Sequence, residues 1–131
     1  MAVLPALSDE AASAEARAVF DEIRETRQTD YVNNFWRVLA HDPAQLKSVW
    51  DRVGSVMGPG ALDPVVKEMI YIAVSAANGC GYCVHSHTAS ARAKGMSPAM
   101  HAELLAVIAM ASQTNALATA LQVPVDERFL A

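Results

Sequence analysis

The sequence predicts an all-α protein, because helical periodicity runs through most of the chain and the pattern of a β-strand does not stand out. Ala, Leu, Met and Glu dominate, with apolar residues three and four positions apart. Strands would instead show short alternating runs of Val, Ile, Thr and aromatic residues between turns. We therefore expect a bundle of about six to seven helices.

Capping and turn residues divide the chain into these helices. Ser8 is expected to cap the first helix. In Asp42-Pro43, Asp63-Pro64 and Ser97-Pro98, a capping side chain precedes a proline at the first helical position. Asn78-Gly79 is a helix-ending turn. The expected helices span residues 8–26, 34–40, 43–57, 64–77, 80–95, 98–112 and 115–121.

Length and composition favour one globular domain, residues 1–131, that shares surface with copies of itself. The chain has 131 residues, of which 53% are hydrophobic and 18% charged, and this excludes disorder. The apolar fraction is high for so small a body, which has much surface per volume. Apolar side chains left over from the core would be buried between subunits, so we expect a homo-oligomer.

Charge and hydropathy argue against nucleic acid and membrane partners. The net charge is −4 and the ten basic residues are scattered, so no concentrated basic face is available for a phosphate backbone. The longest apolar stretches are too short to span a bilayer. Residues 1–7 lack the basic start and the long apolar run of a signal peptide. We expect a cytoplasmic protein.

The two cysteines, Cys80 and Cys83, form a Cys-x-x-Cys pair at the start of a predicted helix. In a reducing compartment such a pair is a redox couple or half of a metal site more often than a structural disulfide. Unpaired N–H groups and the helix dipole favour the thiolate, which is the nucleophile. One helical turn separates the two residues, so their sulfurs can approach bonding geometry.

A histidine and a glutamate are expected beside this pair. His87 follows Cys83 by four residues, so it lies on the same helix face and can take the Cys83 proton. In a helix hairpin about Asn78-Gly79, Glu68 and His87 fall at nearly the same height. A carboxylate there would orient the imidazole and stabilise its charged form. The inferred chain runs from Glu68 through His87 to Cys83, with Cys80 as the resolving thiol.

Less specific interpretations compete with this one. Cys-x-x-Cys is also found in structural and metal roles. Segment 64–77 is apolar nearly all round, as in a buried helix, and its narrow polar line at Glu68, Tyr71 and Ser75 could equally be a solvent face. Zinc could take Cys80, Cys83, His87 and Glu68 as ligands. Three ligands from little more than one turn would strain a tetrahedron, so we expect no metal and no cofactor beyond a Cys80–Cys83 redox disulfide.

Taken together, the motif resembles a known family signature. Glu68, eleven intervening residues, Cys80-x-x-Cys83, three intervening residues and His87 are similar to the alkylhydroperoxidase D-like (AhpD-like) branch of the carboxymuconolactone decarboxylase family. The similarity covers roughly residues 31–121. It implies an AhpD-like helical bundle with a central antiparallel helix hairpin, assembled as a trimer or hexamer.

The resemblance also implies an activity. Such proteins are thiol-dependent peroxidases that reduce organic peroxides or hydrogen peroxide, and a lipoyl-type or thioredoxin-like dithiol recycles the disulfide. By position, Cys83 would attack peroxide, Cys80 would resolve, and Glu68 with His87 would relay protons. Tyr82 stands where some relatives have histidine; with a reference pKa near 10, its hydroxyl suits hydrogen-bond donation better than base catalysis.

Two other functions remain open at this point. One is a non-redox enzyme like carboxymuconolactone decarboxylase, using His87 and Glu68 as acid and base with the cysteines incidental. The other is an oxidant-sensing module in which the thiols form a disulfide without turnover.

Overall fold

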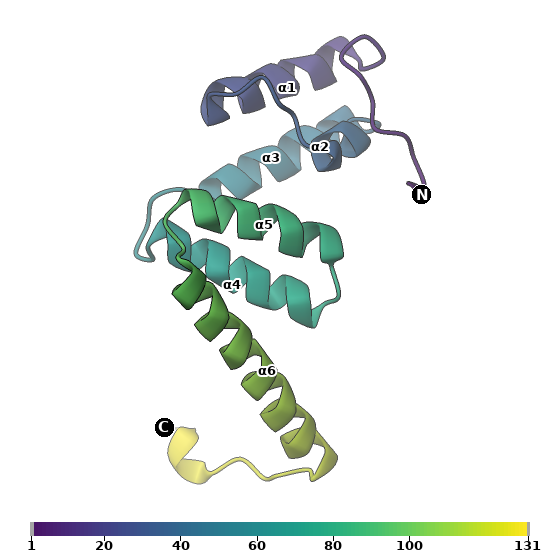
Figure 1. The fold of residues 1–131 in the computed structure, drawn as a ribbon. Coiled ribbons are helices and arrows are strands. Elements are labelled where there is room, and N and C mark those ends of the chain that lie inside the picture. Colours follow the sequence, from purple (N-terminus) through teal and green to yellow (C-terminus); the bar gives the residue numbers. More distant parts are fainter. Residues whose placement is uncertain (1, 131) are drawn as a thin grey trace. The chain divides into compact units, whose positions relative to one another are not determined.

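The computed structural model describes residues 2–130, which are helical without any strand (Figure 1). The all-α prediction is therefore confirmed. In chain order the elements are α1 (Ala14–Arg27), α2 (Asn34–Leu39), α3 (Pro43–Met57), α4 (Pro64–Ala77), α5 (Gly81–Ala93), α6 (Pro98–Ala120) and the short 3₁₀ helix η1 (Glu127–Phe129).

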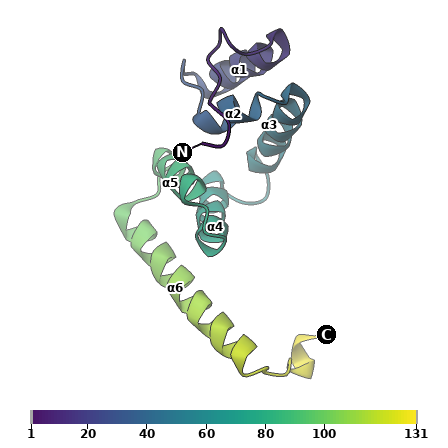
Figure 2. The ribbon, with the colours of Figure 1, turned by 90° about the vertical axis from the view of Figure 1, so that its right-hand side faces the viewer.

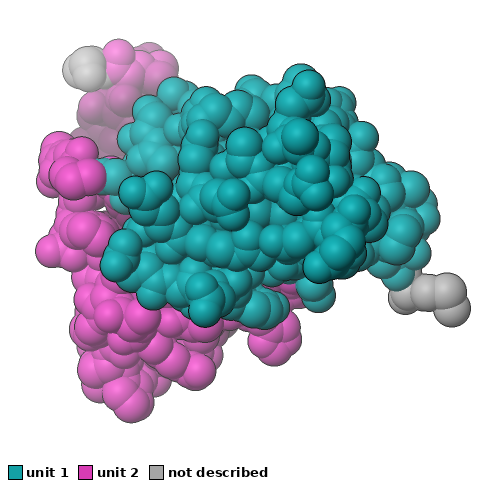
Figure 3. All heavy atoms as spheres, turned by 90° about the horizontal axis from the view of Figure 1, so that it is seen from above, with its two compact units in different colours: residues 1–58 teal, residues 59–131 magenta. Residues whose placement is uncertain are grey.

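The chain packs as two compact units, residues 1–58 and 59–131 (Figure 3). The first contains α1, α2 and α3, and the second contains α4, α5, α6 and η1. The division falls within Gly58-Pro59-Gly60, the break expected from the sequence after the third helix. That the chain is a single domain stays a prediction.

The core of the first unit is aromatic and aliphatic. α1 and α2 both pack on α3, and the Trp36 and Trp50 rings meet edge to face with centroids 5.4 Å apart. The Arg27 guanidinium lies 5.4 Å from the Trp50 ring centroid and 5.8 Å from that of Trp36. The largest fully buried side chains of this unit are Phe20, Ile23, Leu46 and Val32.

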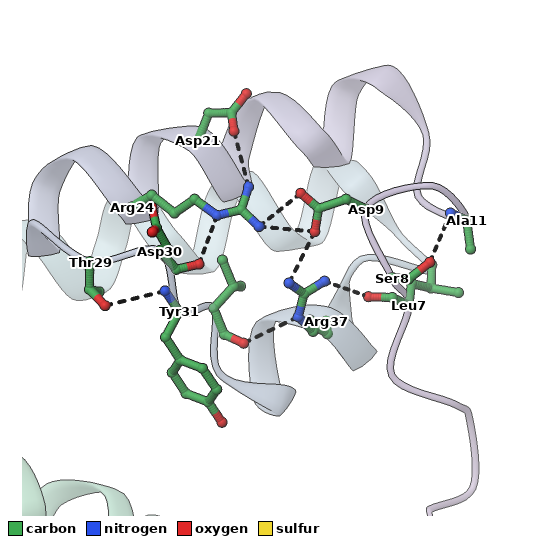
Figure 4. Close-up of polar contacts among 11 residues, drawn as sticks. Leu7, Ser8, Asp9, Ala11, Asp21, Arg24, Thr29, Asp30, Tyr31 and Arg37 are labelled. Atoms are coloured by element: carbon green, nitrogen blue, oxygen red, sulfur yellow. Dashed lines mark hydrogen bonds and ion pairs between the residues drawn. The ribbon is translucent and has the colours of Figure 1, made fainter.

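A polar network fastens the segment before α1 to the rest of this unit (Figure 4). The Asp9 carboxylate accepts from Arg24 at 2.8 Å and from Arg37 at 3.0 Å. Arg37 also donates to the carbonyl oxygens of Leu7 at 2.8 Å and Val32 at 3.2 Å. Two loop segments and two helices thus share one set of charge-assisted hydrogen bonds.

The second unit is built on an antiparallel hairpin of α4 and α5 (Figures 1 and 2). Asp63 caps α4 by accepting from the Val65 N–H, and Asn78-Gly79 turns the chain, with Gly79 at φ 73°. α6 packs on α4 and extends beyond the hairpin. The core consists of buried Ile72, Ala91 and Met96, with Val65, Met69, Met100 and Leu104 packed against it.

The faces of α4 differ from the expectation of a helix buried nearly all round. Val66, Ile70 and Val74 lie four residues apart in one row and are 38%, 48% and 52% exposed. The polar Glu68 and Ser75 are buried instead. The reason is that α5 and α6 cover only part of this apolar cylinder, and α5 covers the side that carries Glu68. None of the described residues of α6 is buried.

Two helix boundaries were predicted wrongly. The first helix begins at Ala14, because Ser13 accepts from the Ala16 N–H at 3.1 Å, whereas Ser8 closes only an isolated turn with Ala11. Residues 98–112 and 115–121 form one helix rather than two. Its Ser112 hydroxyl donates to the Ile108 carbonyl at 2.8 Å, which lets a polar side chain remain inside the helix.

In the part of the chain that the structure describes, no helix combines the length and apolar character needed to cross a membrane.

Candidate active site in the α4–α5 hairpin

The four residues singled out in the sequence all lie on the α4–α5 hairpin. α4 carries Glu68, Cys80 caps α5, and Cys83 and His87 follow on its first two turns. The hairpin forms for local reasons: an Asp-Pro start and a Gly turn.

The cysteines are joined as a Cys80–Cys83 disulfide, with Cα atoms 5.4 Å apart. Cys80 is the N-cap of α5, and its Sγ accepts from the Cys83 N–H at 3.3 Å. A sulfur thus occupies the place that a Ser or Asp oxygen takes at most helix starts. The N-terminal N–H groups and the helix dipole that surround it favour negative charge on sulfur after reduction.

Glu68 and His87 are in direct contact across the hairpin. His87 Nδ1 lies 2.7 Å from Glu68 Oε2, and Glu68 is 3% exposed. The equal heights deduced from the turn position therefore correspond to a real hydrogen bond. The roles of these residues in catalysis stay predictions.

Ser90 and Lys94 complete the environment of the carboxylate, and neither was predicted from the sequence. Glu68 Oε1 accepts from Ser90 Oγ at 2.9 Å and from Lys94 Nζ at 2.5 Å. The spacing of 87, 90 and 94 places three polar side chains on one face of α5, and this periodicity could have identified them.

These hydrogen bonds fix the ionisation of Glu68. Burial would raise its pKa, but hydrogen bonds from His87, Lys94 and Ser90 and the charge of Lys94 outweigh burial and lower the pKa to about 2. The carboxylate is therefore ionised at neutral pH and can only accept hydrogen bonds. It follows that His87 Nδ1 carries a proton, which leaves Nε2 as the nitrogen able to take a proton when the ring is neutral.

Tyr71 fixes the plane of the imidazole. Its ring stacks on that of His87, with centroids 3.6 Å apart and planes 17° from parallel. From the sequence, Tyr71 was predicted only to lie on the polar line of its helix; its position three residues after Glu68 was the available signal for a place beside His87. Tyr82, considered as an accessory residue, is 45% exposed.

The expected proton relay also requires His87 to reach Cys83, and no hydrogen bond joins these two described residues in the disulfide form. Cys83 and His87 are one turn apart on α5, and within residues 2–130 no hydrogen bond joins His87 to either sulfur. Those residues also contain no group of three or more His, Cys, Asp and Glu side chains placed to hold a metal ion. Glu68 instead uses both oxygens in hydrogen bonds within the hairpin.

Comparison with known proteins agrees with this architecture. Residues 44–126 match the model of the carboxymuconolactone decarboxylase family. A crystal structure of the alkylhydroperoxidase AhpD core from Rhodospirillum rubrum is 61% identical, with a TM-score of 0.96, covering 100% of this chain and 98% of that one.

Longer relatives match over part of their length. The alkyl hydroperoxide reductase AhpD of Solibacter usitatus is 45% identical over 64 residues, which are 49% of this chain and 34% of that protein. The protein of the same name from Azorhizobium caulinodans is 33% identical over 106 residues, 74% of this chain and 55% of that protein. The chain thus spans between about a third and about half of the length of these curated relatives.

Proposed function

Because the chain belongs to the carboxymuconolactone decarboxylase family, in its AhpD-like branch, we propose that it is a thiol-dependent peroxidase for organic peroxides or hydrogen peroxide. The observation that carries the proposal is a Cys80–Cys83 disulfide at a helix N-terminus, one turn from a histidine that is hydrogen-bonded to a buried, ionised glutamate.

The reaction begins with the reduced pair. His87 Nε2 accepts the Cys83 proton, and the thiolate attacks the terminal oxygen of the peroxide. The O–O bond breaks, the Cys83 sulfur becomes a sulfenic acid, and the alkoxide leaves as the alcohol after taking the proton from His87. Cys80, as thiolate, then attacks the Cys83 sulfur. The S–S bond forms and hydroxide departs, taking a proton to become water.

An external dithiol completes the cycle. Its thiolate attacks the Cys80–Cys83 disulfide, and a second exchange releases the reduced pair and the oxidised donor. A lipoyl-type or thioredoxin-like donor supplies both electrons. A cytoplasmic location, where such donors are kept reduced, suits this cycle.

Assembly into a homo-oligomer, a trimer or a hexamer, belongs to the same proposal. The exposed row of Val66, Ile70 and Val74 on α4 supports it, as do Leu105, Val107, Met110 and Leu117, each at least half exposed on α6. Apolar surface of this extent is commonly buried between subunits.

A coupled assay with peroxide and an added dithiol tests the activity. We expect turnover in the unmodified protein, loss of turnover in Cys83→Ser, and a sulfenic acid on Cys83 by mass spectrometry after one peroxide pulse to Cys80→Ser. Activity that survives alkylation of both thiols would instead favour a non-redox acid–base enzyme. One equivalent of disulfide without further turnover would favour an oxidant sensor.

A further inference from the structure

Glu68 is shared between two groups that can carry positive charge. His87 binds one carboxylate oxygen at 2.7 Å, and Lys94 binds the other at 2.5 Å. The Lys94 side chain is 37% exposed, while that of Glu68 is 4% exposed. The lysine therefore reaches from the hairpin surface to a buried anion, and its position at the C-cap of α5 sets it seven residues beyond His87.

We propose that Lys94 is a positioning residue that holds Glu68 as the acceptor for His87 Nδ1 and balances the carboxylate charge, so that loss of Lys94 would strengthen the attraction of the carboxylate for a proton on His87. The effect of Lys94 on catalysis rests on the proposed peroxidase function. The charge interaction among Lys94, Glu68 and His87 is a property of the folded hairpin and does not depend on that function.

The effect of Lys94 on His87 follows from the charges in this partly buried cluster. A carboxylate alone beside His87 would stabilise the imidazolium form, and an imidazolium cannot take the proton of Cys83. With Lys94 bound to the same carboxylate, the cluster is already neutral. A proton added to His87 would then give the cluster a net positive charge, with the side chains of His87 and Lys94 only 21% and 37% exposed.

The charge that acts on the Glu68 carboxylate comes from Lys94. On α4, Tyr71 stacks on the ring of His87, and on α5, Ser90 donates to Glu68 as a neutral hydroxyl. Within residues 2–130, neither Glu68 nor His87 forms a hydrogen bond or ion pair with His85 or Arg92 on α5. The same holds for His101 and Glu103 on α6, the helix that packs on α4. Lys94 is thus the charged partner in contact with the pair.

Nuclear magnetic resonance titration of the His87 ring in the disulfide form tests the coupling without any turnover. In Lys94→Met we expect the His87 midpoint to move up by about one pH unit, and the acidic limb of kcat/KM to move with it. Lys94→Arg keeps the charge and should bring the midpoint back toward that of the wild type. Lys47→Met is the matched control, because Lys47 also binds two carboxylates, Glu22 and Asp51, but in the first unit.

A second variant separates charge from structure. Ser90→Ala removes a hydrogen bond from the same oxygen without removing charge, so its His87 midpoint should stay within a few tenths of a unit of wild type. An unmoved midpoint in Lys94→Met, or equal shifts in Ser90→Ala and Lys94→Met, would overturn the inference. A shifted midpoint in a protein without peroxidase activity would uphold the coupling and contradict the proposed function.

Discussion

The buried carboxylate of Glu68 should make the stability of the hairpin depend on pH in a calculable way. Its pKa falls from 4.5 to about 2 on folding, so the folded state binds the proton less tightly than the unfolded state. The resulting stabilisation is fully present above about pH 4.5 and is lost as pH falls through about 2. A difference of about 2.5 pH units corresponds to about 3 kcal/mol.

Urea unfolding of the disulfide form between pH 2 and pH 7, at one protein concentration, measures this quantity. Wild type and Glu68→Gln should give nearly parallel free energies of unfolding above pH 5. Below that, wild type should lose about 3 kcal/mol more than the variant, because glutamine has no proton to gain. Glu103→Gln, which removes an exposed carboxylate from α6, is the matched control and should follow wild type.

Equal pH dependence in wild type and Glu68→Gln over the whole range would refute this reasoning. It would mean that the hydrogen bonds of His87, Ser90 and Lys94 do not stabilise the ionised form beyond the cost of its burial.

Three further outcomes are expected. Tyr71→Phe should keep the stacking on the His87 ring and retain most of kcat, whereas Tyr71→Ala should lower kcat several-fold and broaden the His87 ring resonances; equal kcat in both variants would show that stacking by Tyr71 does not position the His87 ring for catalysis. Under reducing conditions, Cys80→Ala should lose about 1 kcal/mol of unfolding free energy relative to Cys80→Ser, because serine can still cap α5; identical urea midpoints would argue against capping by this residue. Ile70→Lys should shift the mass measured by light scattering toward the monomer, while Lys67→Arg, a charge-preserving change on the same helix, should not; an unchanged mass in Ile70→Lys would exclude this row from the interface.

Helix boundaries could be predicted from the sequence where their signals are local and unambiguous. α3 and α4 begin at the expected prolines and end at the expected residues, because an Asp cap precedes the proline that opens each helix and a Gly or Asn follows its last residue. The start of α1 could not be chosen in this way. Ser8 and Ser13 are both suitable N-cap residues, and both accept a hydrogen bond from a backbone N–H three residues on, so residue type alone could not choose between them.

The site was predictable to the extent that it depends on hairpin symmetry. Glu68 and His87 meet because they are nearly equidistant from one turn. The spacing from His87 could place Lys94 on the same helix face, but it could not say whether this long flexible side chain turns to solvent or inward to the buried carboxylate. The sequence also could not say which part of an apolar α4 would stay uncovered, because that depends on where α5 and α6 pack.

Because Cys80 Sγ caps α5, we expect reduction of the Cys80–Cys83 disulfide to change how well ordered the first turn of α5 is. Sulfur in a disulfide is a weak acceptor, whereas a thiolate in the same place carries a full charge and draws the Cys83 N–H more strongly. Two-electron reduction should therefore tighten the first turn of α5, and slower amide hydrogen exchange at Cys83 would report it. By thermodynamic reciprocity, whatever orders that turn, a bound donor or a neighbouring subunit, also makes the pair easier to reduce.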